Sequence, residues 1–110
     1  MLRTLAVVTL LLLALPAYGQ DFQKGLDAYY SGDYATALRE WSPLADDGDT
    51  GSQYSLGVMY GSGTGVAQDY AEAVRWFRQA AAQGHAGAQN NLGLLYGNGD
   101  GVTRGARRRP

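Results

Sequence analysis

The residues best suited to bind a nucleotide form the run YGSGTGV, from Tyr60 to Val66, in which three glycines stand at alternate positions. A glycine-rich loop binds phosphate when it follows a β-strand and opens a helix, because backbone amides at the helix start then face the anion. Here the loop follows a helical pattern, contains no lysine and leads to Asp69, whose carboxylate would repel phosphate. The pattern also returns as GNGDGV 36 residues later. We therefore interpret the loop as a connector between helices.

Groups suited to catalysis or metal binding are sparse. The only histidine, His85, occupies the position that Asp49 holds 36 residues earlier, so we interpret it as a turn residue that starts a helix rather than a general base. The acidic turn of Asp46, Asp47 and Asp49 lacks the longer ligand series, ending in glutamate, of an EF-type calcium loop. No serine or threonine is grouped with a histidine and an acid as a hydrolase triad requires, and the chain has no cysteine. We predict no catalytic residue, no metal ligand and no cofactor, and therefore a protein that is not an enzyme.

Residues 1–19 have the pattern of a cleaved secretory signal peptide. A positively charged start is followed by an almost unbroken apolar run, Leu5 to Leu15, and by small residues at Ala17 and Gly19. We place cleavage after Gly19. An uncleaved membrane anchor is the alternative, but a run of this length covers only about half of a ~30 Å hydrocarbon core. Because no cysteine follows to carry a lipid, we expect a periplasmic or secreted protein without a stable membrane anchor.

Charge divides the remainder of the chain into two parts. Residues 20–102, which we expect to form one repeat domain, carry four basic and ten acidic side chains, a net charge of −6. The last eight residues, TRGARRRP, carry four arginines and no acid. The acidic body would repel nucleic acid, so we expect no nucleic-acid partner. We interpret residues 103–110 as an Arg-rich disordered tail.

An internal repeat of 36 residues organises the domain. QYSLGVMYGSGTGV, starting at Gln53, aligns with QNNLGLLYGNGDGV, starting at Gln89, with eight of fourteen positions identical. DYATALREWSPLADDG, starting at Asp33, aligns at the same offset with DYAEAVRWFRQAAAQG, starting at Asp69, with seven of sixteen identical. Each unit therefore contains a helix, a loop, a second helix and a glycine that ends it.

The second helix of each unit has clear start and stop signals. Asp69 and Glu72 match a capping box, and Gly84 supplies the left-handed residue that follows a last helical turn. Asp33 and Gly48 frame the earlier copy in the same way. Between the signals of the later copy, an apolar stripe recurs at spacings of three and four residues: Tyr70, Ala73, Val74, Phe77, Ala80 and Ala81.

Three further features concern packing. Pro43 removes one backbone donor late in the earlier copy, so we expect a kink or an early end there. Gly57 and Gly93 stand inside the partner helices, where each costs about 1 kcal/mol relative to alanine. We interpret both glycines as sites where a neighbouring helix approaches the backbone closely. The large aromatic residues are interpreted as core or inter-repeat contacts rather than as sugar platforms: Trp41, Trp76 and Phe77.

Together these residues resemble the Sel-1-like repeat, a relative of the tetratricopeptide repeat. The matching pattern comprises Ala88-Gln89, Leu56-Gly57, Tyr60, the loop Gly61 to Val66, Asp69, Ala73, Trp76-Phe77 and Ala81-Ala82-Gln83-Gly84. The resemblance covers residues 20–102 and implies an all-α fold, an α-solenoid of antiparallel helix pairs with two and a half repeats. It also implies a scaffold that binds a protein or peptide. The first unit departs from the pattern, because its connector, Ser31-Gly32, is as short as a tetratricopeptide turn.

The last repeat is incomplete. After GDGV the family pattern would continue with an aspartate-led second helix, whereas the sequence reads TRGARRRP. The helix expected over 87–96 therefore lacks its partner, and no polar helix caps the array. Either the chain is a truncated member of a longer array, which we prefer, or the exposed face meets a partner or a second copy. Self-association through the last repeat is thus one expected alternative.

The candidate partner-binding face follows from the resemblance to tetratricopeptide proteins, in which the first helix of each pair lines the inner face. Tyr54 and Val58 share one face of such a helix, and their counterparts are Asn90 and Leu94. This mixed surface suits an extended peptide or a partner helix. We therefore predict an exported, non-catalytic protein-protein interaction scaffold that binds a peptide or partner protein in the cell envelope. The alternatives are an envelope enzyme or inhibitor that acts on peptidoglycan, and a fragment without a function of its own.

Overall fold

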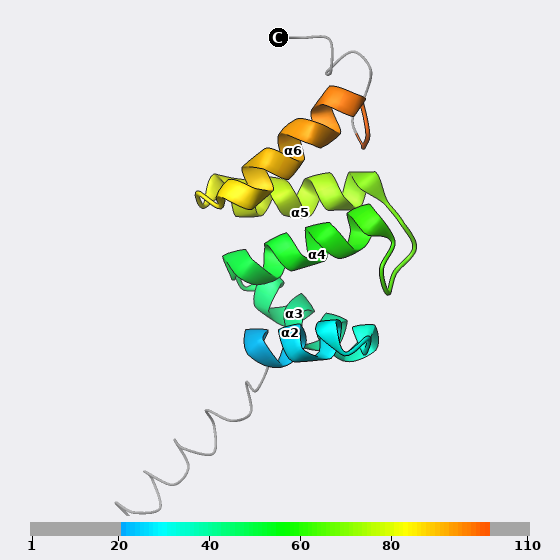
Figure 1. The fold of residues 1–110 in the computed structure, drawn as a ribbon. Helices are drawn as coiled ribbons and strands as arrows, with labels where there is room; N and C mark the ends of the chain where they lie inside the picture. Colours follow the sequence, from blue (N-terminus) through cyan, green and yellow to red (C-terminus); the bar gives the residue numbers. More distant parts are fainter. Residues whose placement is uncertain (1–20, 102–110) are drawn as a thin grey trace, which may run out of the picture.

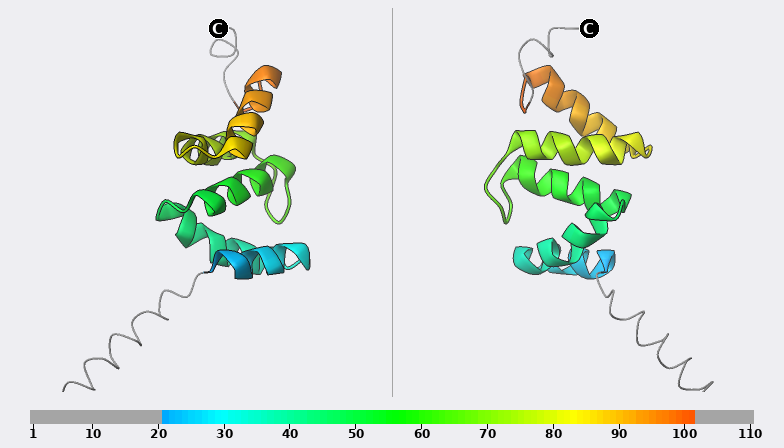
Figure 2. Two further views of the ribbon diagram at one scale, coloured as in Figure 1. Left: turned by 60° about the vertical axis from the view of Figure 1, so that its left-hand side comes forward. Right: turned by 180° about the vertical axis from the view of Figure 1, so that it is seen from behind.

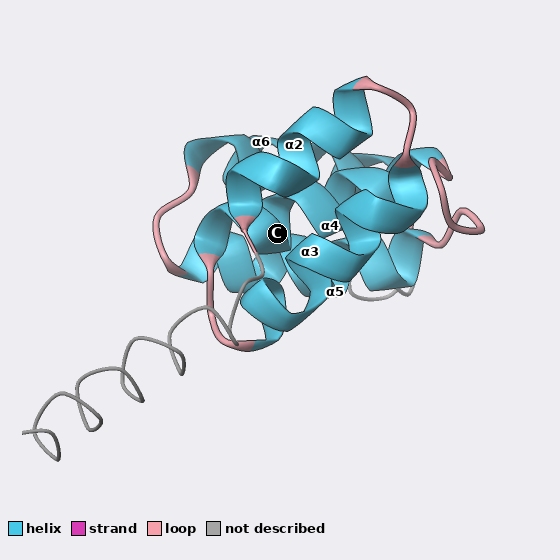
Figure 3. Cartoon of the chain, turned by 90° about the horizontal axis from the view of Figure 1, so that it is seen from below, coloured by secondary structure: helices cyan, strands magenta, loops and turns pink. Residues whose placement is uncertain are grey.

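The fold is a stack of α-helices, with no strand in the part of the chain that the structure describes (Figure 1; Figure 3). The computed structural model describes residues 21–101. The helices are α2 (Phe22–Tyr30), α3 (Tyr34–Asp46), α4 (Thr50–Ser62), α5 (Tyr70–Ala82) and α6 (Ala86–Asn98). The predicted all-α solenoid is confirmed. The signal peptide predicted at 1–19 and the tail predicted at 103–110 lie outside the described residues.

Each helix packs on its neighbours in sequence, and α2 and α6 lie at opposite ends of the stack (Figure 1; Figure 2). Besides these consecutive pairs, α4 also contacts α6. Such nearest-neighbour packing is the arrangement of a solenoid, in which each repeat buries its apolar surface against the next. No helix among residues 21–101 is long and apolar enough to cross a membrane.

Aspartate side chains start the helices from α2 to α5. Each of the four accepts a hydrogen bond from a backbone amide of the first turn: Asp21, Asp33, Asp49 and Asp69. The capping box predicted for α5 is half formed, because Asp69 accepts from the Glu72 amide at 3.1 Å but its own amide donates to the Tyr60 carbonyl. The Glu72 carboxylate instead pairs with Arg75 at 2.6 Å.

The cap of α3 makes a pH-dependent contribution to stability. Thr36 donates to the Asp33 carboxylate from its hydroxyl at 2.7 Å and from its backbone amide at 3.2 Å. These bonds lower the pKa of Asp33 from its ordinary value of 3.8, because they favour the ionised form. The carboxylate therefore stabilises the fold above that ordinary value, and the contribution is lost as the pH falls through the lowered pKa.

At the ends of the second helices, α3 and α5, the glycine stops are as predicted, whereas Pro43 does not end α3. Gly48 and Gly84 follow α3 and α5 with φ of +99° and +91°, which confirms them as left-handed stop residues. Of the two alternatives predicted at Pro43, a kink or an early end, the early end is wrong, because α3 continues through Pro43 to Asp46. Pro43 lies in the last turn, where its missing N–H removes one helical bond while its carbonyl still accepts from the Asp47 amide at 3.1 Å.

The glycine-rich loop connects α4 to α5, as predicted, and folds back onto the preceding pair of helices. Gly63 ends α4 in the left-handed conformation, with φ of +70°. A Cβ atom added at Gly65 would lie 2.5 Å from the Cβ of Tyr34, at the start of α3. A Cβ atom added at Gly101, one repeat later, would lie as close to the backbone of Tyr70, at the start of α5. The alternate glycines therefore allow backbone packing between successive pairs and do not form a cradle at a helix start.

Aromatic side chains of the second helices form the core. Trp41, Trp76 and Phe77 are at most 5 % exposed, which confirms their interpretation as packing residues. Trp41 and Trp76 belong to the larger apolar cluster, and Phe77 belongs to a smaller cluster built around α5 and α6. The Trp41 indole also donates to the Phe22 carbonyl at 3.1 Å, which ties α3 to the first turn of α2.

Gly57 makes the predicted close approach, whereas Gly93 does not. A Cβ atom at Gly57 would lie 2.6 Å from the ring of Phe77 on α5. At Gly93, which is exposed, no described residue lies within 4 Å of such an atom, so the prediction for this residue is wrong. Gly93 occupies in α6 the place that Gly57 has in α4, but among residues 21–101 no further helix follows to cover it.

Gly57→Ala should destabilise the fold, whereas its matched control, Gly93→Ala, should leave stability unchanged or raise it. The methyl group added at residue 57 overlaps Phe77, and overpacking of this kind costs about 1–3 kcal/mol. At residue 93 the methyl group meets no described atom, and replacing a helical glycine by alanine gains up to about 1 kcal/mol. Thermal unfolding followed by circular dichroism measures both changes. A Gly57→Ala chain as stable as the parent would contradict the close contact.

Candidate functional site

The first helices of successive pairs, α2, α4 and α6, share one face of the stack, and two pockets lie between them. We call this the inner face. The ring of Trp41 lies over Gly25 of α2 as the ring of Phe77 lies over Gly57 of α4. The helices α2 and α4 therefore correspond at an offset of 32 residues rather than 36, because the connector that follows α2 is four residues shorter.

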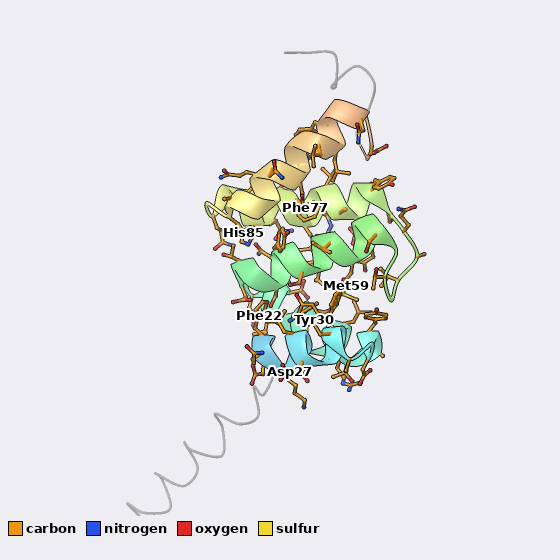
Figure 4. All side chains as sticks on the ribbon, in the orientation of Figure 1. Phe22, Asp27, Tyr30, Met59, Phe77 and His85 are labelled. Atoms are coloured by element: carbon orange, nitrogen blue, oxygen red, sulfur yellow. The ribbon has the colours of Figure 1, made fainter. Side chains whose placement is uncertain are left out.

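The first pocket lies between α2 and α4 and has a volume of about 350 Å³. Its walls are mainly aromatic, and its floor includes the buried indole of Trp41. Figure 4 shows Phe22 and Tyr30 on the side of α2 that faces α4, with Asp27 on the opposite side. The lining comprises Phe22, Leu26, Tyr29, Tyr30, Trp41, Gly51, Tyr54, Ser55, Val58 and His85.

Contacts among the aromatic rings fix the walls of the first pocket. The ring of Tyr54 stacks on the imidazole of His85 with 4.4 Å between centroids and lies 5.7 Å from the ring of Phe77. On the opposite wall, the ring of Tyr29 lies 5.9 Å from that of Trp41. Tyr30 is different, because its side chain is 82 % exposed at the rim. The pocket thus has walls of contacting aromatic rings and one exposed ring, that of Tyr30, at its rim.

The second pocket lies between α4 and α6, with Phe77 of α5 in the place that Trp41 has in the first. Its volume is about 230 Å³, and its lining is largely small or aliphatic: Gly57, Val58, Gly61, Tyr70, Phe77, Asn91, Leu94 and Leu95. Val58 lines both pockets. The inner face therefore offers two adjacent pockets of different size that share one wall.

The structure brings together three of the four residues predicted for the partner-binding face. Tyr54 and Val58 line the first pocket, and Val58 and Leu94 line the second. Leu94 is 61 % exposed. Asn90 is exposed and lines neither pocket, since its neighbour Asn91 takes that place. Their role in binding stays a prediction.

His85 starts α6, as predicted, and also contributes to the first pocket, which was not predicted. Its Nδ1 accepts a hydrogen bond from the Ala88 amide at 3.0 Å, as the Asp49 carboxylate does from the Ser52 amide at 2.9 Å. Asp49 of the acidic turn thus serves as a helix cap. Among the described residues no group of three histidine, cysteine or acidic side chains is placed to hold a metal ion.

Sequence reasoning missed the contribution of α2 to the first pocket. The 36-residue offset does not extend to this helix, so it supplied no counterparts for Tyr54 and Val58. A signal was present in the spacing of four apolar residues at intervals of three and four: Phe22, Leu26, Tyr29 and Tyr30. At the offset of 32, Phe22 and Leu26 take the positions of Tyr54 and Val58.

Comparison with known proteins identifies the architecture. The Sel1 repeat matches residues 50–85 and 86–108, more than half of the chain. The chain belongs to the Sel1 repeat family. The first matched unit begins with α4 and ends at His85, the cap of α6. Sel1 repeats are generally protein-interaction scaffolds, which is a non-catalytic role.

A solved structure with the same architecture is that of c5321, described as a protective antigen present in uropathogenic Escherichia coli strains displaying an SLR fold. The two share 36 % sequence identity with a TM-score of 0.68, over 82 % of this chain and 21 % of c5321. This Sel1 repeat chain thus spans about a fifth of that protein's length. No curated protein matches it.

His85→Asp should be more stable than His85→Ala by about 1 kcal/mol, the usual contribution of an N-cap. Both substitutions remove the stacking contact with Tyr54, so the difference between them isolates the cap. Asp49 shows that an aspartate serves at the equivalent position. Urea unfolding of the two variants measures the difference, and equal midpoints would show that the Ala88 hydrogen bond contributes nothing.

Proposed function

We propose that this Sel1 repeat protein is an exported, non-catalytic scaffold that binds a peptide or partner protein in the cell envelope through its inner face. The observation that carries the proposal is the continuity of the two pockets at Val58. A single ligand can therefore place two neighbouring side chains into the face. Extended peptides and amphipathic helices are both recognised by side chains that enter successive apolar pockets.

The volumes of the two pockets and the net charge of the repeat domain indicate the chemistry of the ligand. The larger, aromatic pocket suits a bulky apolar or aromatic side chain, and the smaller pocket suits an aliphatic one. Residues 20–102 carry a net charge of −6, so a ligand with basic residues beside its apolar anchors would associate faster and more selectively. The partner we propose is a basic segment with two apolar anchors.

Tyr30→Ala should weaken peptide binding at least tenfold without destabilising the fold. The side chain is 82 % exposed at the rim of the first pocket, so its removal costs the free chain little, whereas aromatic anchors at interfaces contribute strongly to affinity. Peptides selected on the immobilised chain from a random displayed library supply the probes. Fluorescence anisotropy then gives the Kd of each labelled peptide for the parent and the variant.

Arg39→Ala is the matched control, because Arg39 is an exposed residue of α3 that lines neither pocket. The control should bind the selected peptides as tightly as the parent. Two results would overturn the proposal: selection that yields no peptide of micromolar affinity, or peptides whose Kd is the same for Tyr30→Ala and the parent.

Export is tested separately from binding. The proposed signal peptide predicts that the chain, expressed in a Gram-negative bacterium, is recovered from the periplasm or medium with Gln20 as its first residue. Cleavage after Gly19 follows from the small residues at Ala17 and Gly19. Intact mass and N-terminal sequencing measure the product. A chain that retains Met1 and stays in the cytoplasm would contradict export and leave the binding proposal to its own test.

A further inference from the structure

The hydroxyl group of Ser55 is a polar group in the first pocket that no described residue satisfies. Ser55 is 9 % exposed and lines the pocket between α2 and α4. The two other serines of α4 have partners, because Ser52 donates to Asp49 at 2.7 Å and Ser62 donates to the Val58 carbonyl at 2.8 Å. Among residues 21–101, no group pairs with the Ser55 hydroxyl in the same way.

The Ser55 hydroxyl can be reached from the pocket. Among the described residues, the indole nitrogen of Trp76 is the one fully enclosed side-chain donor or acceptor without a partner. The Ser55 oxygen, which also has no described partner, is therefore not enclosed. Since polar groups inside proteins are normally paired, this hydroxyl is available to a ligand. A hydroxyl both donates and accepts a hydrogen bond, so it suits a ligand group that does the same.

His85 adds a hydrogen-bond donor to the same pocket. Its Nδ1 accepts from the Ala88 amide, so Nδ1 carries no proton and the proton of the neutral imidazole is on Nε2. Cε1 and Nδ1 are the ring atoms of His85 that lie against Gly87 of α6, and no described residue accepts from Nε2. The side chain of His85 is half-buried, whereas Ser55 is buried. The donor therefore lies nearer the mouth of the pocket than the Ser55 hydroxyl does.

The remaining lining determines which kind of ligand group the pocket accepts. Aromatic side chains dominate it, and such rings pair favourably with a further ring. The described lining contains no aspartate, glutamate, lysine or arginine, so an ionised group would lose its hydration without gaining a counter-charge. The volume of about 350 Å³ is near the lower end of the range for small-molecule sites, about 300–1,000 Å³. One neutral aromatic ring with a polar tip therefore fits the pocket.

We propose that the first pocket binds a tyrosine side chain of the partner peptide and that Ser55 determines this specificity. The tyrosine hydroxyl stands at the far end of its ring, where it pairs with the Ser55 hydroxyl. Phenylalanine has no such group, and the indole N–H of tryptophan lies on the side of its ring and only donates. His85 donates from Nε2 to the main-chain carbonyl beside the ring. The inference rests on the proposed function, because it names the side chain that the inner face takes from its peptide.

N-acetyl-tyrosinamide and N-acetyl-phenylalaninamide are matched probes, because they differ only in the hydroxyl and both carry the amide carbonyls of a peptide. Added to the ¹⁵N-labelled chain, the tyrosine probe should produce saturable chemical-shift changes at Tyr54, Ser55 and Val58. Its Kd should be at least fivefold lower than that of the phenylalanine probe, because a site that pairs with a hydroxyl rejects the analogue that lacks it. Both probes should shift the imidazole Nε2 resonance of His85.

Ser55→Ala removes the hydroxyl and should remove the preference for tyrosine. The variant should bind the tyrosine probe at least fivefold more weakly than the parent does, and the phenylalanine probe equally well. Its melting temperature should be unchanged or higher, because the hydroxyl has no described partner and alanine is the better helix former. Ser62→Ala is the matched control, because it makes the same substitution on α4 at a residue that lines neither pocket. This control should keep the preference.

The proposal fails if the two probes have equal Kd values, if Ser55→Ala keeps the preference, or if neither probe shifts the pocket resonances at its highest soluble concentration. It also fails if the chain is a dimer that Ser55→Ala makes monomeric, since the pocket would then hold a tyrosine of a second copy. Library peptides that bind through Tyr30 but contain no tyrosine would contradict this inference alone. A tyrosine probe that binds as expected while no peptide can be selected would support the preference of the pocket and contradict the proposed function alone.

Discussion

Aromatic rings that lie directly on glycine backbones set the spacing of the helices. Trp41 covers Gly25, and Phe77 covers Gly57. In each pair the absence of a Cβ atom lets the second helix approach the first more closely than a side chain would allow, and dense packing of this kind resists change. The same contacts place a ring at the floor of each inner-face pocket. The shape of the candidate site therefore depends on two glycines, of which Gly57 lines the second pocket and Gly25 lines neither.

Hydrogen bonds of buried polar side chains fix how neighbouring helices align along their axes, which apolar contacts alone do not determine. Gln53 is 3 % exposed and links the end of α3 to α5, because it donates to the Ala45 carbonyl and accepts from Gln83. Glu40 is 6 % exposed and accepts from the Asp21 amide at 2.8 Å, so a side chain of α3 completes the cap of α2. Because an unpaired buried polar group is costly, a slip of either helix pair by one residue would be strongly disfavoured.

The sequence predicts the structural features that depend on the spacing of residues within one helix or repeat. It does not predict the contacts that depend on a segment far away in the chain. The caps at Asp33 and Asp69, the glycine stops, and the burial of Trp41 and Phe77 follow from patterns within one helix or one repeat. The close contact predicted at Gly93 is wrong because the helix that would make it is not among the described residues. The role of α2 was missed because a shorter connector changes the repeat offset, and that change becomes visible only when Trp41 is seen on Gly25.

The junction between α5 and α6 has a consequence for the evolution of the array. His85 precedes α6 with φ of −73° and ψ of 110°, nearly the values of −67° and 114° at Asp49 before α4. Residues 50–85 thus begin just after one cap and end on the next. A tandem duplication of this segment would join His85 to Thr50 and reproduce the native junction geometry. It would also keep the hydrogen bond that the glutamine side chain of the first helix donates to a carbonyl of the preceding helix. Because each repeat of a solenoid contacts only its neighbours, a chain with one more or one fewer copy of this segment would need no compensating substitution at the seam.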